Sequence, residues 1–129
     1  MAPVAAAILA AALSAGCGGD PAGLVSGWAR VSGTVRTAAG APVAGVTPSF
    51  AVFRDAACTE RVLTTVHTYP EPPVTDAAGH YQTEVLVHAW GAFQGCLAVT
   101  ANGVTVHVPA SFAGARENAP AVQVDVSVP

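Results

Sequence analysis

The chain has 129 residues, of which 52% are hydrophobic and only 10% are charged, a balance that predicts a folded domain rather than a disordered chain. Its formal net charge is −3, and its five basic residues are arginines scattered along the chain. Because no basic stripe is present to neutralise phosphates, we expect no nucleic-acid partner.

The N-terminal segment 1–16 is expected to be an export signal. Residues 4–15 form an unbroken apolar run, which suits the helix of a secretory signal and falls short of the roughly 20 residues of a spanning helix. Residues 13–17, with the sequence LSAGC, resemble the lipobox of bacterial lipoproteins. The resemblance implies that Cys17 becomes the lipid-carrying first residue of the mature protein. An uncleaved anchor and a cleaved but unmodified Cys17 are the alternatives.

After a flexible linker over 17–27, the chain shows strand-like alternation and no long helical period. In the first strand, for example, Val31, Gly33 and Val35 share one face. The expected strands cover residues 28–36, 46–54, 61–69, 81–90, 94–101, 104–108 and 121–128, with a further short strand before residue 77. Seven or eight short strands separated by turn signals predict an all-β fold, an antiparallel β-sandwich that occupies residues 28–129.

Three turns are predicted between these strands. Gly40 and Pro42 form the first, since glycine accepts a positive φ and proline fixes its own φ. In the second, Asp76 is placed to accept backbone N–H groups and Gly79 to supply a left-handed residue. The Asn-Gly pair at 102–103 is the strongest hairpin signal of the chain.

Three cysteines are an odd number for an exported protein. Lipidation would use Cys17 and leave Cys58 and Cys96 as a pair, which should form a disulfide in an oxidising compartment. Two free buried thiols are the alternative. Metal binding by this pair has less support, because no CxxC or CxxH spacing is present.

Two stretches carry a family resemblance. Residues 31–46 join a strand with an internal glycine to the turn GAPVAGV, and residues 75–81 place the hairpin TDAAGHY before a core strand. With residues 97–103, their order and spacing resemble the carboxypeptidase regulatory-like domain, a transthyretin-like (prealbumin-like) sandwich akin to Ig-like folds. The motif positions are Gly33, Gly40, Pro42, Asp76, Gly79 and Tyr81. The resemblance implies a non-enzymatic accessory, spacer or adhesion module.

The histidines are the natural candidates for site chemistry. They are His67, His80, His88 and His107. No HExxH spacing links them, so we interpret them as surface residues, with a metal shared by His67 and His107 as the alternative. We therefore expect no catalytic residue, no metal and no cofactor.

Together these features predict a lipid-anchored cell-envelope protein whose sandwich is a non-catalytic binding or structural module. Its partners would be the membrane, through lipid on Cys17, and a protein or glycan ligand. If the source has an outer membrane, the glycine at position 18 favours that membrane or the cell surface. Trp28 and Trp90 would offer a stacking platform, although core packing is the expected use of such large aromatics. The alternative function is a small hydrolase or metal-binding enzyme of transthyretin-like fold.

Overall fold

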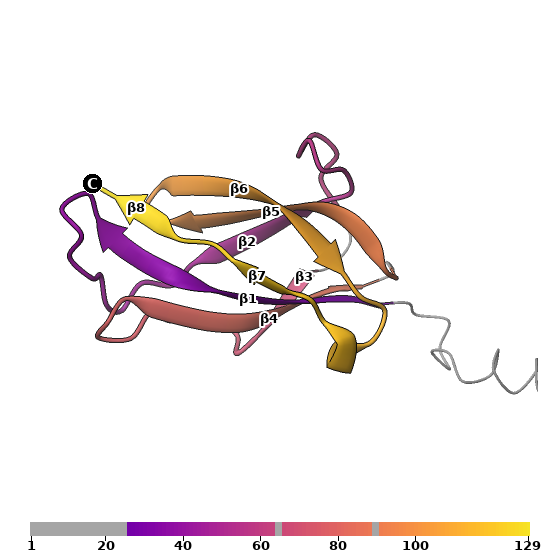
Figure 1. The fold of residues 1–129 in the computed structure, drawn as a ribbon, viewed down its shortest axis with the longest axis horizontal. Coiled ribbons are helices and arrows are strands. Elements are labelled where there is room, and N and C mark those ends of the chain that lie inside the picture. The colour runs from indigo at the N-terminus through magenta and orange to yellow at the C-terminus, as the bar shows by residue number, and fades with distance from the viewer. Residues whose placement is uncertain (1–25, 64–65, 89–90) are drawn as a thin grey trace, which may run out of the picture.

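The computed structural model describes residues 26–63, 66–88 and 91–129, which form two β-sheets packed face to face (Figure 1). Sheet 1 has the strand order β3-β4-β1-β7, with β8 also paired to β1, and sheet 2 has the order β2-β5-β6. The bounds are β1 Ser26–Thr37, β2 Ser49–Phe53, β3 Val66–Tyr69, β4 His80–His88, β5 Phe93–Ala101, β6 Val104–Phe112, the 3₁₀ helix η1 Arg116–Asn118, β7 Ala121–Gln123 and β8 Val126–Val128. The predicted all-β sandwich is confirmed, with eight strands among these residues.

Strand β1 is the centre of sheet 1. Its side chains alternate, so that Val31 and Val35 are buried in the core while Arg30 and Ser32 are exposed. Strand β4 lies antiparallel on one side of β1. Strands β7 and β8 lie parallel to β1 on its other side, and they are the exception to the antiparallel pairing.

The single strand expected over 121–128 is divided at Val124 and Asp125. A Cβ atom at Gly33 would lie only 1.8 Å from the Val124 carbonyl oxygen, so the two backbones meet more closely here than side chains allow. The Val124 N–H donates to the Ser32 oxygen at 2.9 Å. The Asp125 carboxylate then accepts the Thr34 N–H at 2.9 Å, which takes the place of a strand carbonyl and interrupts the ladder.

Sheet 2 contains the predicted hairpin and is crosslinked to a loop. Asn102 and Gly103 both adopt positive φ, 46° and 80°, in the turn between β5 and β6. The predicted disulfide between Cys58 and Cys96 is present, with a Cα–Cα distance of 5.3 Å. It fixes the loop that follows β2 against β5.

Two expected strands are shorter than predicted, and one segment forms no regular strand. Strand β2 begins at Ser49, directly after Pro48, whose missing N–H cannot join a ladder. Strand β3 covers only the end of the expected 61–69, of which residues 64–65 lie outside the described residues. Thr75 instead donates its N–H to the Val46 oxygen at 2.8 Å, in a connection outside the named strands. The export signal, Cys17 and Trp90 also lie outside the described residues.

The core between the sheets consists mainly of small β-branched side chains. Its largest fully buried members include Leu97, Val31, Val35, Val52, Val85, Val87, Val99, Val124 and Val126. Trp28 is not in this cluster, because it lies on the face of β1 opposite to Val31. The expectation that Trp28 packs in the core is therefore wrong, and its ring is part of the outer surface of sheet 1.

Candidate functional site

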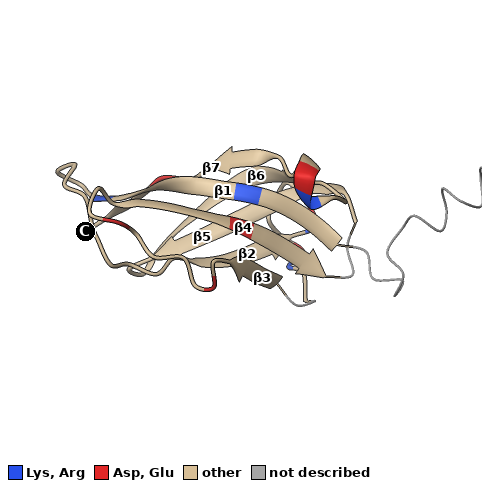
Figure 2. Ribbon diagram, turned by 90° about the horizontal axis from the view of Figure 1, so that it is seen from below, with Lys and Arg blue, Asp and Glu red and all other residues tan. Residues whose placement is uncertain are grey.

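The side of sheet 1 that faces away from sheet 2, here called the outer face, brings the polar and aromatic residues of three strands together. Strand register places Ser32 beside Gln82, and Arg30 beside Glu84. On the other side of β4, Tyr69 of β3 also lies beside Glu84. Figure 2 shows how sparse the charges are, with one basic position on β1 beside an acidic position on β4.

An arginine from η1 holds the aromatic part of this face. The Arg116 Nε donates to both carboxylate oxygens of Glu84, at 3.0 and 3.1 Å, and its Nη2 donates to Oε1. The guanidinium carbon lies 5.2 Å from the Trp28 ring centroid and 5.9 Å from that of Tyr69. The two rings are themselves 6.2 Å apart. Cation–π contact and a two-pronged ion pair therefore fix the position of Tyr69.

The ion pair shifts the ionisation of both partners. Hydrogen bonds from Arg116, rather than its longer-range charge, are the main cause that lowers the pKa of the Glu84 carboxyl. The same hydrogen bond raises the pKa of Arg116. Both groups are therefore charged near neutral pH, and each side chain has the other as its partner.

Two histidines extend the aromatic part of the outer face. The rings of His67 and His88 meet edge to face with centroids 5.0 Å apart. His67 Nδ1 lies 3.6 Å from a Glu71 carboxylate oxygen. Leu86 of β4 lies between His67 and Trp28 and is buried although it is outside the sandwich core, so this end of the face has a small apolar centre of its own.

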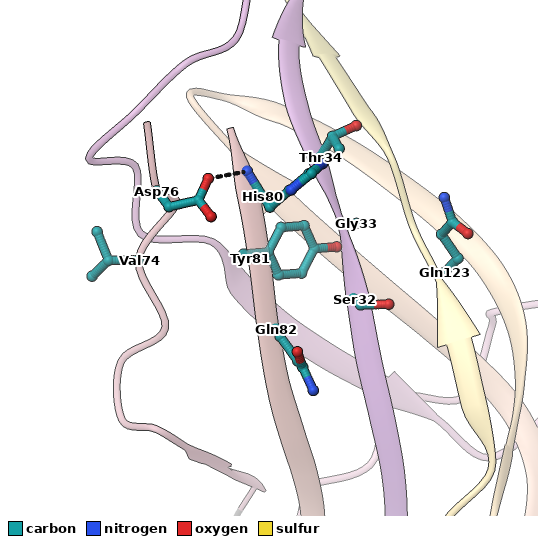
Figure 3. A pocket seen from close by; sticks show the side chains of 9 residues that line it. All are labelled: Ser32, Gly33, Thr34, Val74, Asp76, His80, Tyr81, Gln82 and Gln123. Carbon is teal, nitrogen blue, oxygen red and sulfur yellow. Dashed lines mark hydrogen bonds between the residues drawn. The ribbon is translucent and has the colours of Figure 1, made fainter. Parts of the chain in front are cut away.

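Two open depressions follow one another along β1 and β4. The first, of about 550 Å³, is lined by residues that include Ser32, Gln82 and His80 (Figure 3). The second, of about 490 Å³, is lined by residues that include Tyr69, Arg30 and Gln82. Because Gln82 belongs to both, the two depressions adjoin each other on the outer face.

Tyr81 forms the floor of the first depression, and its role there is structural. Its hydroxyl donates to the Val124 oxygen at 2.7 Å, and in Figure 3 its ring points from β4 toward Gly33 of β1. Burial is the main cause that raises the pKa of the Tyr81 hydroxyl, and the negative charge of Asp125 adds to it. The phenol is thus kept as a neutral hydrogen-bond donor that caps the carbonyl at the β7–β8 break.

The turn residues named from the sequence lie at the same end of sheet 1. The Asp76 carboxylate accepts the N–H groups of Ala78 and His80, both at 2.9 Å. Gly79 has a φ of 78°, and a Cβ there would lie 3.2 Å from the Pro42 Cβ. Gly40, with a φ of 88°, lies in the adjoining turn. Gly33, Asp76 and Gly79 therefore lie beside Tyr81 or its strand, and Pro42 lies beside Gly79.

The histidine pair considered from the sequence does not form a site. His67 is on β3 with its neighbour Val66 packed on the core, so His67 points outward from sheet 1. His107 is on β6 of sheet 2, between the core residues Val106 and Val108, and its ring contacts Phe53 with centroids 5.9 Å apart. The two rings lie on opposite sides of the sandwich, so the hypothesis of a shared metal is wrong. Within residues 26–63, 66–88 and 91–129, no group of three or more His, Cys, Asp or Glu side chains is placed to hold a metal.

Sequence reasoning missed Tyr69, Glu84 and Arg116 as members of one cluster. Arg116 and Glu84 are 32 residues apart, and only the return of the chain through η1 brings them together. The signal that was available is the alternation of β1, which places Trp28 on the same face as Arg30 and Ser32.

Comparisons with protein-family models, with curated proteins and with solved structures find no match for this chain. In the described part of the chain, no helix has the length and apolar character needed to cross a membrane.

Proposed function

We propose that the chain is an exported protein anchored to a membrane through lipid on Cys17, and that its sandwich is a non-catalytic binding module of the carboxypeptidase regulatory-like kind. The observation that supports a binding role is the outer face of sheet 1. It combines two adjoining depressions with an exposed aromatic ring that an ion pair holds in place. Sites that bind small or chain-like ligands commonly combine such a concavity with a few polar groups.

The family assignment is supported by the way the motif residues meet. Gly33 admits the close approach of Val124, Tyr81 caps the carbonyl of that residue, and Gly79 packs against Pro42. Motif residues that are distant in sequence thus lie close together at one end of sheet 1, which is consistent with the proposed family pattern.

The anchor is tested by the intact mass of the mature protein. We expect a chain that begins at Cys17 and carries diacylglycerol, with or without a further acyl group, and that partitions with membranes. A Cys17→Ser variant should lose the lipid and leave the membrane fraction. An unmodified Cys17, or a retained N-terminal methionine, would contradict the proposal.

The binding face is tested by photo-crosslinking on intact cells. A photoreactive phenylalanine analogue replaces Ala121, which is exposed on β7 beside Arg30. The matched control replaces Ser111, which is exposed on β6 of sheet 2. We expect an adduct at position 121 and none at 111. No adduct at 121, or equal adducts at both positions, would refute the outer face as a binding surface.

A further inference from the structure

We infer that the outer face of sheet 1 binds a neutral oligosaccharide chain, which stacks on Tyr69 and hydrogen-bonds to Gln82 and Ser32. This inference rests on the proposed binding function and names the class of ligand. A sugar ring has an apolar face of C–H groups and a rim of hydroxyls that both donate and accept. Its binding site therefore needs a flat aromatic surface beside neutral groups that also donate and accept.

The flat surface is the Tyr69 ring. It is 41% exposed, although it is an aromatic side chain within a strand. Arg116 and Trp28 contact it from the side of β1, so its position is fixed before any ligand arrives. A pre-positioned ring binds without the entropic cost of ordering the side chain.

The neutral groups are Ser32 and Gln82. Strand register places them side by side, and within the described part of the chain neither side chain makes a hydrogen bond. A hydroxyl and a primary amide each donate and accept, which matches the hydroxyl groups of a sugar. Both line the first depression, and Gln82 also reaches the second, which Tyr69 lines.

The charged side chains around the two depressions favour an oligosaccharide without charged groups. The nearby carboxylates already have partners within the protein, since Glu84 pairs with Arg116, Asp76 accepts backbone N–H groups and Asp125 accepts from Thr34. Among the described residues, Arg30 is the only arginine that lines either depression. A chain that carries many phosphate or sulfate groups would need several converging cations, whereas the guanidinium of Arg30 alone can donate hydrogen bonds to the oxygens of neutral hydroxyls.

The length and position of the two depressions favour an oligosaccharide over an extended peptide. From Glu84, beside Tyr69, to His80 at the far end of the first depression, four residue-to-residue steps along β4 span about 13 Å. This length suits a short chain of linked sugar rings. An extended peptide would add to a strand edge through backbone hydrogen bonds, and these groups lie on the face of the sheet.

The adduct formed at position 121 identifies the ligand. After proteinase digestion of the crosslinked protein, we expect the peptide that contains position 121 to keep its added mass. That added mass should correspond to neutral sugar residues and should be destroyed by periodate. A polypeptide adduct would overturn the sugar inference and leave the proposed binding face standing. An adduct that carries sulfate, phosphate or uronate would overturn its neutral character. The absence of any adduct at 121 would refute the proposed function itself.

Further substitutions, made in the protein that carries the photoreactive residue at position 121, identify the side chains that contact the ligand. Tyr69→Ala and Gln82→Ala should each lower the adduct yield at limiting ligand about tenfold, while Tyr69→Phe should keep it. The control Ser111→Ala should have no effect. Equal yields from Tyr69→Ala and the control would refute stacking on this ring, provided that the circular dichroism of the variant shows the native fold.

Discussion

The hydrogen bond between Tyr81 and Val124 gives the sharpest test of how this fold is held together. Tyr81→Phe keeps the buried ring and removes only the hydroxyl, which donates to the Val124 oxygen at 2.7 Å. The lost bond is worth about 0.5–1.5 kcal/mol, and leaving a buried carbonyl unpaired costs about 1–3 kcal/mol. Since Val124 is only 1% exposed, water cannot easily replace the hydroxyl. We therefore expect the free energy of unfolding to fall by about 1–3 kcal/mol.

Urea unfolding of the oxidised protein, followed by circular dichroism, measures this loss. Tyr69→Phe is the matched control, because its ring is exposed and should tolerate the change within about 0.5 kcal/mol. Equal stabilities of the two variants would refute the reasoning.

The pH dependence of the free energy of unfolding tests the role of the Tyr81 hydroxyl in a second way. Because burial raises the pKa of Tyr81, the folded protein keeps this proton to higher pH than the unfolded chain. The stabilisation is complete below the ordinary tyrosine pKa of about 10 and is lost as pH rises above it. Tyr81→Phe should therefore lose stability less steeply than the parent protein above this pH, and equal slopes for the two proteins would contradict the role given to the buried hydroxyl.

Gly33→Ala should lower the free energy of unfolding by at least about 3 kcal/mol in chemical denaturation, because the new Cβ would lie 1.8 Å from a backbone oxygen that cannot rotate away. Replacing Cys58 and Cys96 by alanine should cost about 4 kcal/mol in urea unfolding, since the disulfide closes a separation of 38 residues. In a carboxyl NMR titration, Glu84 should show a pKa below the ordinary glutamate value, because Arg116 donates to its charged form. Its contribution to stability is present above that ordinary value and is lost as pH falls through the lowered pKa.

Each of these predictions can be contradicted by a stated result, and two of them have a control variant. Gly40→Ala places a side chain at a φ of 88° but meets no atom within 4 Å, so it carries the backbone cost without a clash and should cost only about 1–2 kcal/mol. A loss at Gly33 no larger than this would contradict the clash. Arg116→Gln should raise the pKa of Glu84 toward its ordinary value. The disulfide estimate would be wrong if the alanine double variant lost less than about 1 kcal/mol.

The sheet interiors could be predicted because their signal is local. Alternation along 28–36 and 81–90 placed Val31, Val35 and Val85 toward the core, and the Asn-Gly pair at 102–103 gave the hairpin. The break between β7 and β8 could not be predicted in this way. It depends on the approach of a C-terminal backbone to Gly33, and no property of 121–128 alone indicates that contact.

The outer face was harder to predict for a related reason. Within its own strand, no residue of the outer-face cluster stands out by its sequence context. The cluster forms because strand register places Tyr69 and Arg30 on either side of Glu84. Arg116 then arrives from a connection whose position the sequence does not reveal. The sequence did indicate a possible aromatic platform at Trp28, but the partners of that ring come from β3 and η1.

The alternation of β4 separates the residues that stabilise the fold from those that we propose bind the ligand. Tyr81 and Thr83 are buried and point toward the interior, where Tyr81 holds the β7–β8 break. Gln82 and Glu84 lie between them in sequence and point to the outer face. Substitution of Tyr81 should therefore lower stability with a smaller effect on binding, and substitution of Gln82 should lower binding at unchanged stability. A loss of adduct in Gln82→Ala would then report a lost ligand contact, because the free energy of unfolding of the same variant shows whether the fold has been weakened.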